Sequence, residues 1–456
     1  MSNLKNNLII KNAKLVETDK TVDILVMGGV IDSIFGSEPD SPISVTELIY
    51  NGERRPGEEM CEIIDACGNY ISAGFIDLHV HLRDPGMKYK EDIESGTKSA
   101  VKGGVTTVCC MPNTNPPIDN PKGIKYILES TAYCNVLPAA AITKSQKGEE
   151  LTDFAELKKA GAAALSDDGR PVENDDLMRE AMIKAKENGM LIMSHCEDLT
   201  LSRGGIMNGG ESLKKINGLH NLDLKGIPNE AEDKATKRDI NLVCETGAGL
   251  HIAHVSSGNS VDCIAGAKSR GFNITAETCP HYFSLTDGDV LKYGVNAKMN
   301  PPLRSYADRE KIIDGIKSGV IDCVSTDHAP HSSEDKKDCG NIDFANLKNA
   351  ANGVTGLETS FALGVTYLVN PKYIKLEKLI ELMTVNPAKI IGIDKTRGTI
   401  EAGKAADFTI FNINEKFIYD KNKSYSKSRN TPFHGFELYG KILYTIVNGK
   451  VVYENK

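Results

Sequence analysis

Histidines and aspartates stand at the ends of short apolar runs throughout the middle of this chain. His79 and His81 end the run FIDLHVH, with a single residue between them. Side chains two positions apart on a β-strand point to the same face, so both imidazoles can face one site. Imidazole and carboxylate groups together suit zinc or another borderline divalent ion. On its own the H-x-H pair is more often structural or incidental, because so short a motif recurs by chance.

Further histidines and aspartates follow the same pattern. Asp167 and Asp168 end the run AAALSDD, His195 and His254 stand at the ends of two later runs, and Asp327 ends DCVSTD. If these runs are parallel strands of one barrel, their carboxyl ends meet at one mouth. The joint pattern therefore favours a metal centre over coincidence. A carboxylate after the AAALSDD run could bridge two ions there.

Eight apolar runs alternate with amphipathic helical patterns between residues 73 and 395. Helical stretches such as DFAELKKAGA and LMREAMIKAKENG separate the runs, which predicts βαβ units and a parallel sheet. Eight strands with helical connections close into a barrel, so the predicted fold is an α/β, TIM-like (β/α)8 barrel. The predicted strands are FIDLHVH, VTTVCCM, NVLPAAAI, AAALSDD, MLIMSHC, LHIAHVS, NITAETC and DCVSTD.

Both ends of the chain contain short strand-like runs, such as NLIIKNAKLV and KILYTIVNGKVVY. The Asn-Gly pair in the second run is a strong hairpin signal. We therefore expect residues 1–72 and 396–456 to pair into a small β-sandwich domain beside the barrel of residues 73–395. Residues 37–60 are polar and contain Pro and Gly, which predicts a long surface loop or hairpin.

Composition and charge exclude several classes of protein. The 456 residues carry a net charge of −8 without a basic cluster, which argues against nucleic acid or an anionic membrane as a partner. No run approaches the roughly 20 apolar residues of a membrane span. Eleven cysteines without a C-x-x-C pair are typical of reduced thiols, so we predict a cytoplasmic protein.

Seven motifs stand out: DLHVHLRDPG (77–86), MPNTNP (111–116), SDDG (166–169), SHCED (194–198), AHVSS (253–257), KMNPPLR (298–304) and STDHAPH (325–331). Together they resemble the dihydroorotases, in particular the longer bacterial form of the first type within the amidohydrolase superfamily. The likeness runs through the whole predicted barrel and both β-rich ends. It implies a zinc enzyme that reversibly converts dihydroorotate and water to N-carbamoyl-L-aspartate in de novo pyrimidine (UMP) biosynthesis. A homodimer, or association with the preceding pathway enzyme, would be the assembled form.

The resemblance implies one or two Zn2+ ions per chain. Asp168 would bridge two ions, with Asp167 as the competing candidate for the bridge. Many relatives use a carboxylated lysine at this point, whereas ALSDDG offers only aspartates. This feature matches first-type dihydroorotases and counts against a hydantoinase, dihydropyrimidinase or allantoinase. The implied ligands are His79, His81, Asp168 and Asp327 for one ion, and Asp168, His195 and His254 for the other.

The resemblance also implies contacts with the substrate. Arg83, Asn113 and His331 would hold its free carboxylate, and Arg suits this role because its planar fork grips a carboxylate with two hydrogen bonds. The alternative for Arg83 is an ordinary surface ion pair. Asn300 is expected near the pyrimidine ring.

One loop departs from the family pattern. Dihydroorotases usually carry a Pro-Phe-Gly element after DHAPH, but this chain reads NAANGVTGLET. Asn352 occupies the usual Phe position and Gly353 the usual Gly position. Both are expected to lie at the substrate, and the loop lacks the aromatic side chain that would cover the ring.

Asp327 is the expected catalytic residue as well as a metal ligand. It would move the proton from the attacking water to the leaving ring nitrogen. The alternatives are another cyclic amidase, a non-catalytic homologue that acts as a partner subunit, and a metal-free binding protein. Arg83, the MPNT motif and the missing lysine oppose the first alternative, and the complete set of expected ligands opposes the other two.

Overall fold

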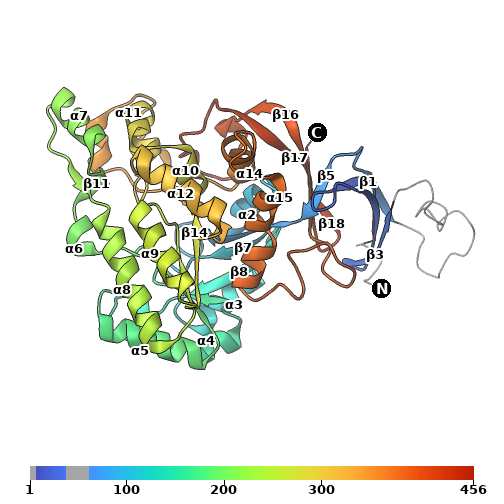
Figure 1. Ribbon diagram of the computed structural model, residues 1–456, viewed down its shortest axis with the longest axis horizontal. Helices are drawn as coiled ribbons and strands as arrows, with labels where there is room; N and C mark the ends of the chain where they lie inside the picture. The colour runs from blue at the N-terminus through green and yellow to red at the C-terminus, as the bar shows by residue number, and fades with distance from the viewer. Residues whose placement is uncertain (1–6, 37–60, 456) are drawn as a thin grey trace, which may run out of the picture.

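The structure is a computed structural model that describes residues 7–36 and 61–455. The stretch 37–60, for which the sequence predicts a surface loop or hairpin, lies outside the described residues. Figure 1 shows a large part built of strands surrounded by helices, with a smaller β-sheet at one side. The first and last described strands both belong to this smaller sheet.

The predicted barrel is confirmed. Its eight strands are parallel, and each pairs with its neighbours in the order of the sequence. The first and last strands meet through a parallel bridge between Val80 and His328, where the His81 N–H donates to the His328 carbonyl at 2.8 Å. The strands are β6 (Phe75–Val80), β7 (Val105–Cys110), β8 (Asn135–Ala140), β9 (Ala164–Leu165), β10 (Leu191–Ser194), β13 (Leu250–Ile252), β14 (Ile274–Thr278) and β15 (Cys323–Val324).

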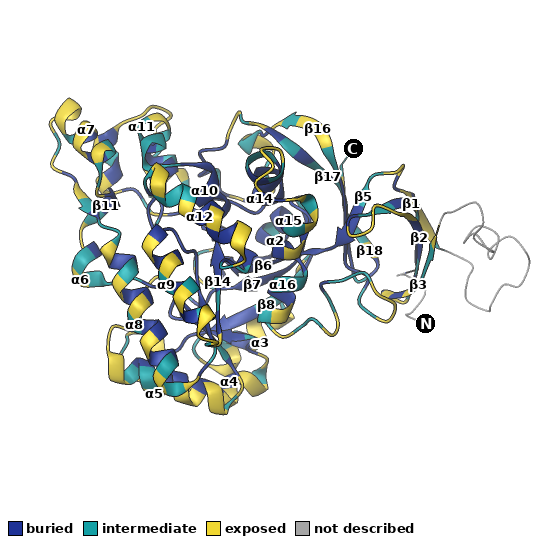
Figure 2. Ribbon diagram, in the orientation of Figure 1, coloured by how far each residue is buried: buried dark blue, intermediate teal, exposed yellow. Residues whose placement is uncertain are grey.

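Helices cover the outside of the barrel and leave its strands buried (Figure 2). Every residue of β6 and β7 is buried, as expected for parallel strands that are covered on both faces. The connecting helices are amphipathic, with buried residues on the face toward the strands. Outside the barrel sheet, β11 (Gly205–Asn208) and β12 (Lys225–Ile227) form a small parallel pair.

Local sequence signals set the helix ends. Helix α2 begins where the Asp92 carboxylate accepts from the Ser95 N–H at 2.7 Å. Helix α4 ends at Gly161, whose φ of 106° suits only glycine. The helices are α2 (Ile93–Lys102), α3 (Pro121–Glu129), α4 (Phe154–Ala160), α5 (Asp175–Glu187), α6 (Leu199–Ser202), α7 (Glu211–His220), α8 (Glu230–Thr246), α9 (Gly258–Ser269), α10 (Pro280–Ser284), α11 (Val290–Tyr293), α12 (Tyr306–Ser318), α13 (Ser333–Lys336), α14 (Ser360–Gly364), α15 (Leu376–Met383) and α16 (Val385–Ile390).

Short 3-10 and π turns complete the helical structure. They are η1 (Lys144–Gln146), η2 (Asp287–Asp289), η3 (Gly294–Ala297), η4 (Phe344–Lys348), η5 (Val365–Val369) and η6 (Lys421–Lys423). Within the described residues, every helix is too short or too polar to reach across a lipid bilayer.

The strands from the two chain ends form one mixed sheet. Strand β5 pairs parallel with β1 and antiparallel with β16, and so joins the two ends. The predicted Asn-Gly hairpin connects the last two strands, and Asn448 and Gly449 have φ of 48° and 75°, as a tight hairpin turn requires. The strands are β1 (Leu8–Leu15), β2 (Thr21–Met27), β3 (Val30–Gly36), β4 (Glu62–Asp65), β5 (Tyr70–Ala73), β16 (Phe408–Ile418), β17 (Glu437–Val447) and β18 (Lys450–Glu454).

This sheet has a hydrophobic cluster of its own. The cluster joins residues of the N-terminal strands, such as Ile10 and Ile24, to Phe408 and Ile446 from the C-terminal strands. A separate core supports the division expected from the sequence. We propose that residues 1–72 and 396–456 form the smaller domain and that residues 73–395 form the barrel domain.

Candidate metal and substrate site

The expected metal ligands all lie at the carboxyl ends of barrel strands. His79 is in β6, and the others directly follow a strand or lie within three residues of its end. Each is buried, with at most 7 % of its surface exposed. The barrel therefore gathers side chains that are far apart in the sequence at one mouth. They are His79, His81, Asp168, His195, His254 and Asp327.

Four imidazoles surround the carboxylate of Asp168. Its Oδ1 lies 3.2 Å from His79 Nε2, 3.5 Å from His254 Nε2 and 3.7 Å from His195 Nδ1, and its Oδ2 lies 3.5 Å from His81 Nε2. Burial alone would raise the pKa of Asp168, but the charge of His79 and the close imidazoles of His254 and His79 hold it well below its usual range. The carboxylate is therefore ionised at the centre of the cluster.

Asp327 also contacts both histidines of the H-x-H pair. Its Oδ1 is 2.9 Å from His81 Nε2 and 3.7 Å from His79 Nε2. Burial raises the pKa of Asp327, but its hydrogen bond with His81 and the charges of the nearby histidines lower it by more. Asp327 and His254 have φ of 45° and 38°. This backbone conformation is costly for residues other than glycine, and it turns both side chains sharply off their strands.

The donor atoms fit a divalent ion. His79 Nε2 and Asp168 Oδ1 are buried and have no hydrogen-bond partner among the described residues. Two overlapping groups of three residues each bring their donor atoms within 4.8 Å of one another. One group is His79, Asp168 and His254, and the other is His79, His81 and Asp327. Buried nitrogen and carboxylate donors this close to one another suit zinc or a related ion.

His195 lies at the edge of this cluster. Its Nδ1 is 2.8 Å from His254 Nε2, and its Nε2 is 2.8 Å from Glu197 Oε2. Glu197 also accepts a hydrogen bond from the Asn300 amide at 3.0 Å. Burial raises the pKa of Glu197, but the hydrogen bond and charge of His195 lower it to about 2. Glu197 therefore orients the His195 ring so that Nδ1 faces the cluster.

Asp167 points away from the histidines, although it neighbours Asp168. Its Oδ1 accepts from the Ile142 N–H at 2.8 Å and the Thr143 N–H at 3.2 Å, and the Thr143 hydroxyl donates to Oδ2. Burial raises the pKa of Asp167 to about 6. These contacts give Asp167 a structural role in the loop after β8, whereas Asp168 faces the candidate ligands.

A buried carboxylate behind the cluster was not found from the sequence. Glu277 on β14 lies 2.9 Å from His79 Nδ1 and 3.2 Å from His251 Nε2. Burial raises the pKa of Glu277, but hydrogen bonds from the two histidines hold it well below its usual range. Such a carboxylate fixes the tautomer of a ligating histidine and orients its ring. The only sequence signal was the position of a glutamate, the single charged residue in the predicted strand NITAETC.

Arg83 and His331 lie together at the mouth. Arg83 Nη2 is 3.3 Å from His331 Nε2, and Arg83 Nε donates to the Pro330 carbonyl at 3.3 Å. Lys90, which the sequence did not predict at the site, places its Nζ 3.3 Å from His331 Nδ1. Burial, followed by the charges of Arg83 and Lys90, lowers the pKa of His331 to about 2. A neutral imidazole between two cations is suited to an anionic group of a substrate.

Asn113 and Asn300 contact groups on the metal side of the site. Asn113 Oδ1 is 2.8 Å from His81 Nδ1, and its Nδ2 is 3.3 Å from Asp168 Oδ2. Asn300 donates to Glu197, as described above. The structure thus brings both amides to the cluster, and Asn113 in particular helps to orient His81.

The loop with Asn352 and Gly353 packs closely against the mouth. Asn352 is exposed and Gly353 is buried. Gly353 has φ of 137°, and a Cβ there would lie 2.6 Å from the Ala329 Cβ. Only glycine fits this position, both for its backbone conformation and for the close approach.

Lys336, a third residue that the sequence did not single out, anchors this loop. Its side chain is fully buried, and Nζ donates to the carbonyls of Lys298, Ala351 and Gly353 at 3.0, 2.9 and 3.1 Å. Burial lowers the pKa of Lys336 to about 7. The three carbonyls hold its ammonium group and so join the loop before Asn300 to the loop at Gly353.

Lys336→Met is expected to destabilise the protein by about 1–3 kcal/mol, because it removes three hydrogen bonds and leaves the Ala351 carbonyl without its recorded donor, while it keeps an unbranched side chain. Denaturant unfolding followed by circular dichroism measures the change. Lys337→Met is the matched control, because the neighbouring lysine is exposed. Equal stability of the two variants would contradict an anchoring role for Lys336.

Comparisons with known proteins agree with this geometry. A family model described as dihydro-orotase-like matches residues 68–260, and one for the amidohydrolase family matches residues 340–453. The chain is 47% identical to a dihydroorotase of Ruminiclostridium cellulolyticum and 46% identical to one of Acetivibrio thermocellus, and each alignment covers 98% of this chain and 99% of the relative. Among solved structures, an L-hydantoinase from Arthrobacter aurescens matches with a TM-score of 0.84 at 27% identity, over 98% of this chain and 96% of that protein.

Proposed function

Since this chain belongs to the dihydroorotase family of metal-dependent cyclic amide hydrolases, we propose that it interconverts dihydroorotate and N-carbamoyl-L-aspartate with zinc as its cofactor. The observation that carries the proposal is the cluster of four imidazoles around the Asp168 carboxylate at the barrel mouth, with Asp327 beside it. Buried cysteines that remain thiols, such as Cys109, Cys134 and Cys323, support a reducing compartment, and we place the enzyme in the cytoplasm, in pyrimidine biosynthesis.

The proposed ligands form two sets that share Asp168. A bound divalent ion would supply Lewis acidity toward the ring carbonyl and would lower the pKa of a nearby water. Asp168 is close to all four histidines, which supports it over Asp167 as the shared ligand. We propose His79, His81, Asp168 and Asp327 for one ion, and Asp168, His195 and His254 for a second.

Asp327 is the group that we propose to move the proton. In hydrolysis a bond forms between the water oxygen and the ring carbonyl carbon, and the bond from that carbon to the ring nitrogen breaks. Asp327 accepts the proton that the water loses and delivers it to the leaving nitrogen. Burial raises the pKa of Asp327, but its hydrogen bond with His81 and the charges of the nearby histidines together lower it by more, so the carboxylate is ionised, which is the form that can accept a proton.

Arg83 and His331 are proposed to hold the free carboxylate of the substrate. Their contact with each other and the nearby Lys90 make this side of the mouth positively charged. Arg83 has φ of 56°, so its backbone turns sharply just after β6 and directs the side chain across the mouth. The carboxylate group distinguishes dihydroorotate from the substrates of general cyclic amidases.

The test combines metal analysis with an assay of one purified preparation. We expect one or two zinc ions per chain and hydrolysis of dihydroorotate that is lost on chelation and restored by zinc. Full hydrolysis by a preparation verified to be free of metal would contradict the proposal. Absence of turnover by the zinc-loaded protein would favour a non-catalytic homologue.

Arg83→Lys is expected to reduce kcat/KM for dihydroorotate by about 10-fold or more, because lysine keeps the charge but loses the two-pronged hydrogen bonding. Turnover of dihydrouracil, which lacks the carboxylate, should hardly change. Steady-state kinetics with both substrates measure the difference. If the unmodified protein turned over dihydrouracil as well as dihydroorotate, a hydantoinase-type activity would be favoured instead.

A further inference from the structure

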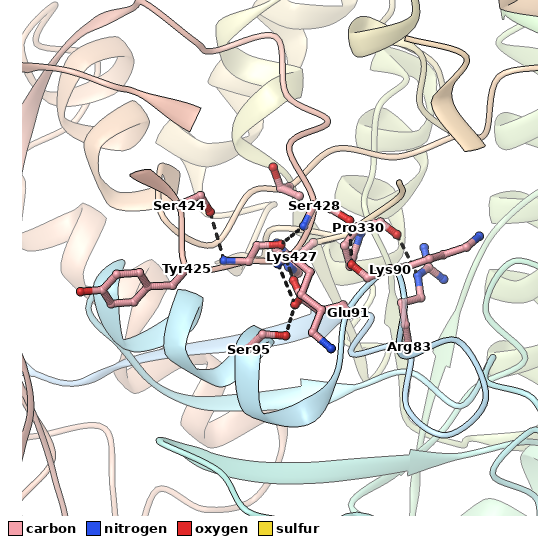
Figure 3. A network of polar contacts seen from close by, with 12 residues as sticks. Arg83, Lys90, Glu91, Ser95, Pro330, Ser424, Tyr425, Lys427 and Ser428 are labelled. Atoms are coloured by element: carbon pink, nitrogen blue, oxygen red, sulfur yellow. Dashed lines mark hydrogen bonds and ion pairs between the residues drawn. The ribbon is translucent and has the colours of Figure 1, made fainter. Parts of the chain in front are cut away.

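A segment of the C-terminal part of the chain reaches the barrel mouth. Residues 424–430 follow η6 and precede β17, which belongs to the smaller sheet. Ser426, Ser428 and Asn430 are each buried. We refer to residues 424–430 as the C-terminal strap, because they run across the barrel beside the loop of Arg83 and Lys90 (Figure 3).

Glu91 fixes the strap to the barrel. Its buried carboxylate, just before α2, accepts from the Ser426 hydroxyl and from the Lys427 N–H at 3.1 Å, and the Ser95 hydroxyl also donates to it. Figure 3 shows Glu91 between Ser95 and Lys427. The Ser428 hydroxyl adds a hydrogen bond of 2.7 Å to the Lys90 carbonyl. A buried carboxylate with this many donors holds the strap in one position.

The side-chain amide of Asn430, at the end of the strap, forms hydrogen bonds with two loops of the mouth. Its Nδ2 donates to the Ala329 carbonyl at 3.0 Å and to the Gly353 carbonyl at 2.9 Å. Its Oδ1 accepts from the His331 N–H at 2.9 Å. One side chain therefore joins the backbone on both sides of Pro330 to the loop of Gly353.

We infer that Asn430 is a positioning residue for the substrate carboxylate. It touches neither the candidate metal ligands nor Arg83 in the contacts of the described residues, and it acts by holding the backbone of His331 and Gly353. This inference rests on the proposed function, which assigns His331 to the carboxylate of the substrate. The smaller sheet thus contributes to substrate binding through the strap.

The contacts also indicate which side of the mouth depends more on Asn430. The Gly353 carbonyl keeps a second donor, Lys336 Nζ at 3.1 Å. The backbone of His331 has its recorded partner in Asn430 alone among the described residues. Loss of the amide should therefore displace His331 more than Gly353, and so weaken binding of the carboxylate more than the chemical step.

The test uses Asn430→Asp and Asn430→Ala in the zinc-loaded full-length protein. The Asp variant keeps the acceptor for the His331 N–H but presents a carboxylate to two carbonyls, and the Ala variant removes all three hydrogen bonds. We expect each to raise KM for dihydroorotate about 10-fold, as for loss of buried hydrogen bonds, with kcat changed by less than about 3-fold because the groups at the reacting atoms remain in place. Zinc content should equal that of the unmodified protein.

Asn386→Asp is the matched control. The Asn386 amide also donates to a barrel carbonyl, that of Asp322 at 2.9 Å, but at the amino end of β15, away from the mouth. Its KM should be unchanged. Unchanged KM in both Asn430 variants, or an equal rise in the control, would overturn the inference while leaving the proposed function intact. If one Asn430 variant has a lower melting temperature or less zinc than the unmodified protein, the KM of the other variant is the test. A fall in kcat without a rise in KM would also contradict a positioning role.

Failure of the proposed function gives a different result. In that case the unmodified protein itself, with zinc bound, would not turn over dihydroorotate, and the inference would fall with it.

Discussion

Asp327→Asn is expected to reduce turnover by at least about 100-fold, the lower end of what a positioned acid–base group contributes. The amide keeps the shape of the side chain but cannot accept the proton from water. Both hydrolysis and ring closure should slow, because one group serves both directions by microscopic reversibility. Zinc should be retained at least in part, because His79, His81 and Asp168 remain, together with His195 and His254. Zinc content and both rates are measured on one preparation.

The control for this variant flanks the same strand. Asp322 precedes β15, at the opposite end from Asp327, and forms an ion pair with Lys268. Asp322→Asn removes a carboxylate from the barrel without touching the mouth, so its turnover should stay near normal. Near-normal turnover of Asp327→Asn with zinc retained would show that Asp327 is a ligand only.

Removal of a residue that only orients a metal ligand typically lowers metal affinity by about 10–100-fold. Asp168→Ala removes a proposed ligand itself, so we expect a larger loss of zinc affinity. The reason is its position among four imidazoles, where it would be shared between two ions. Activity should fall with the metal. Equilibrium dialysis followed by metal analysis gives the affinity, and hydrolysis of dihydroorotate gives the activity.

Asp167→Ala is the matched variant one position away. It removes the acceptor of the Ile142 and Thr143 N–H groups, so it should lower the free energy of unfolding by about 1–3 kcal/mol. Its zinc affinity should be close to normal. If Asp167→Ala lost more zinc and more activity than Asp168→Ala, the bridge would have been assigned to the wrong aspartate.

Local patterns in the sequence determined the barrel and the groups at its mouth. The alternation of apolar runs with amphipathic stretches predicted the eight strands, because buried parallel strands need apolar residues on both faces. His79 and His81 were found because residues two apart on a strand share a face. The asparagine and glycine at 448–449 predicted a hairpin, because few other residues adopt positive φ there. These features depend on neighbours in the chain, so sequence alone carries them.

The sequence left open which of two adjacent aspartates faces the histidines. Side chains of consecutive residues leave a strand end in different directions, and the turn after β9 decides which one points inward. Only the tertiary structure shows Asp167 bound to the loop after β8 and Asp168 among the imidazoles.

The supporting residues were likewise decided by the tertiary structure. Glu277 lies in a strand, Lys336 in a polar segment and Asn430 in the C-terminal strap, and none of them belongs to a recognised motif. Each acts through a partner far away in the sequence: Glu277 on His79, Lys336 on Lys298, and Asn430 on His331. The type of residue that binds a metal or an anion can be recognised from its chemistry, but the partner that holds it in place is set by how distant segments pack.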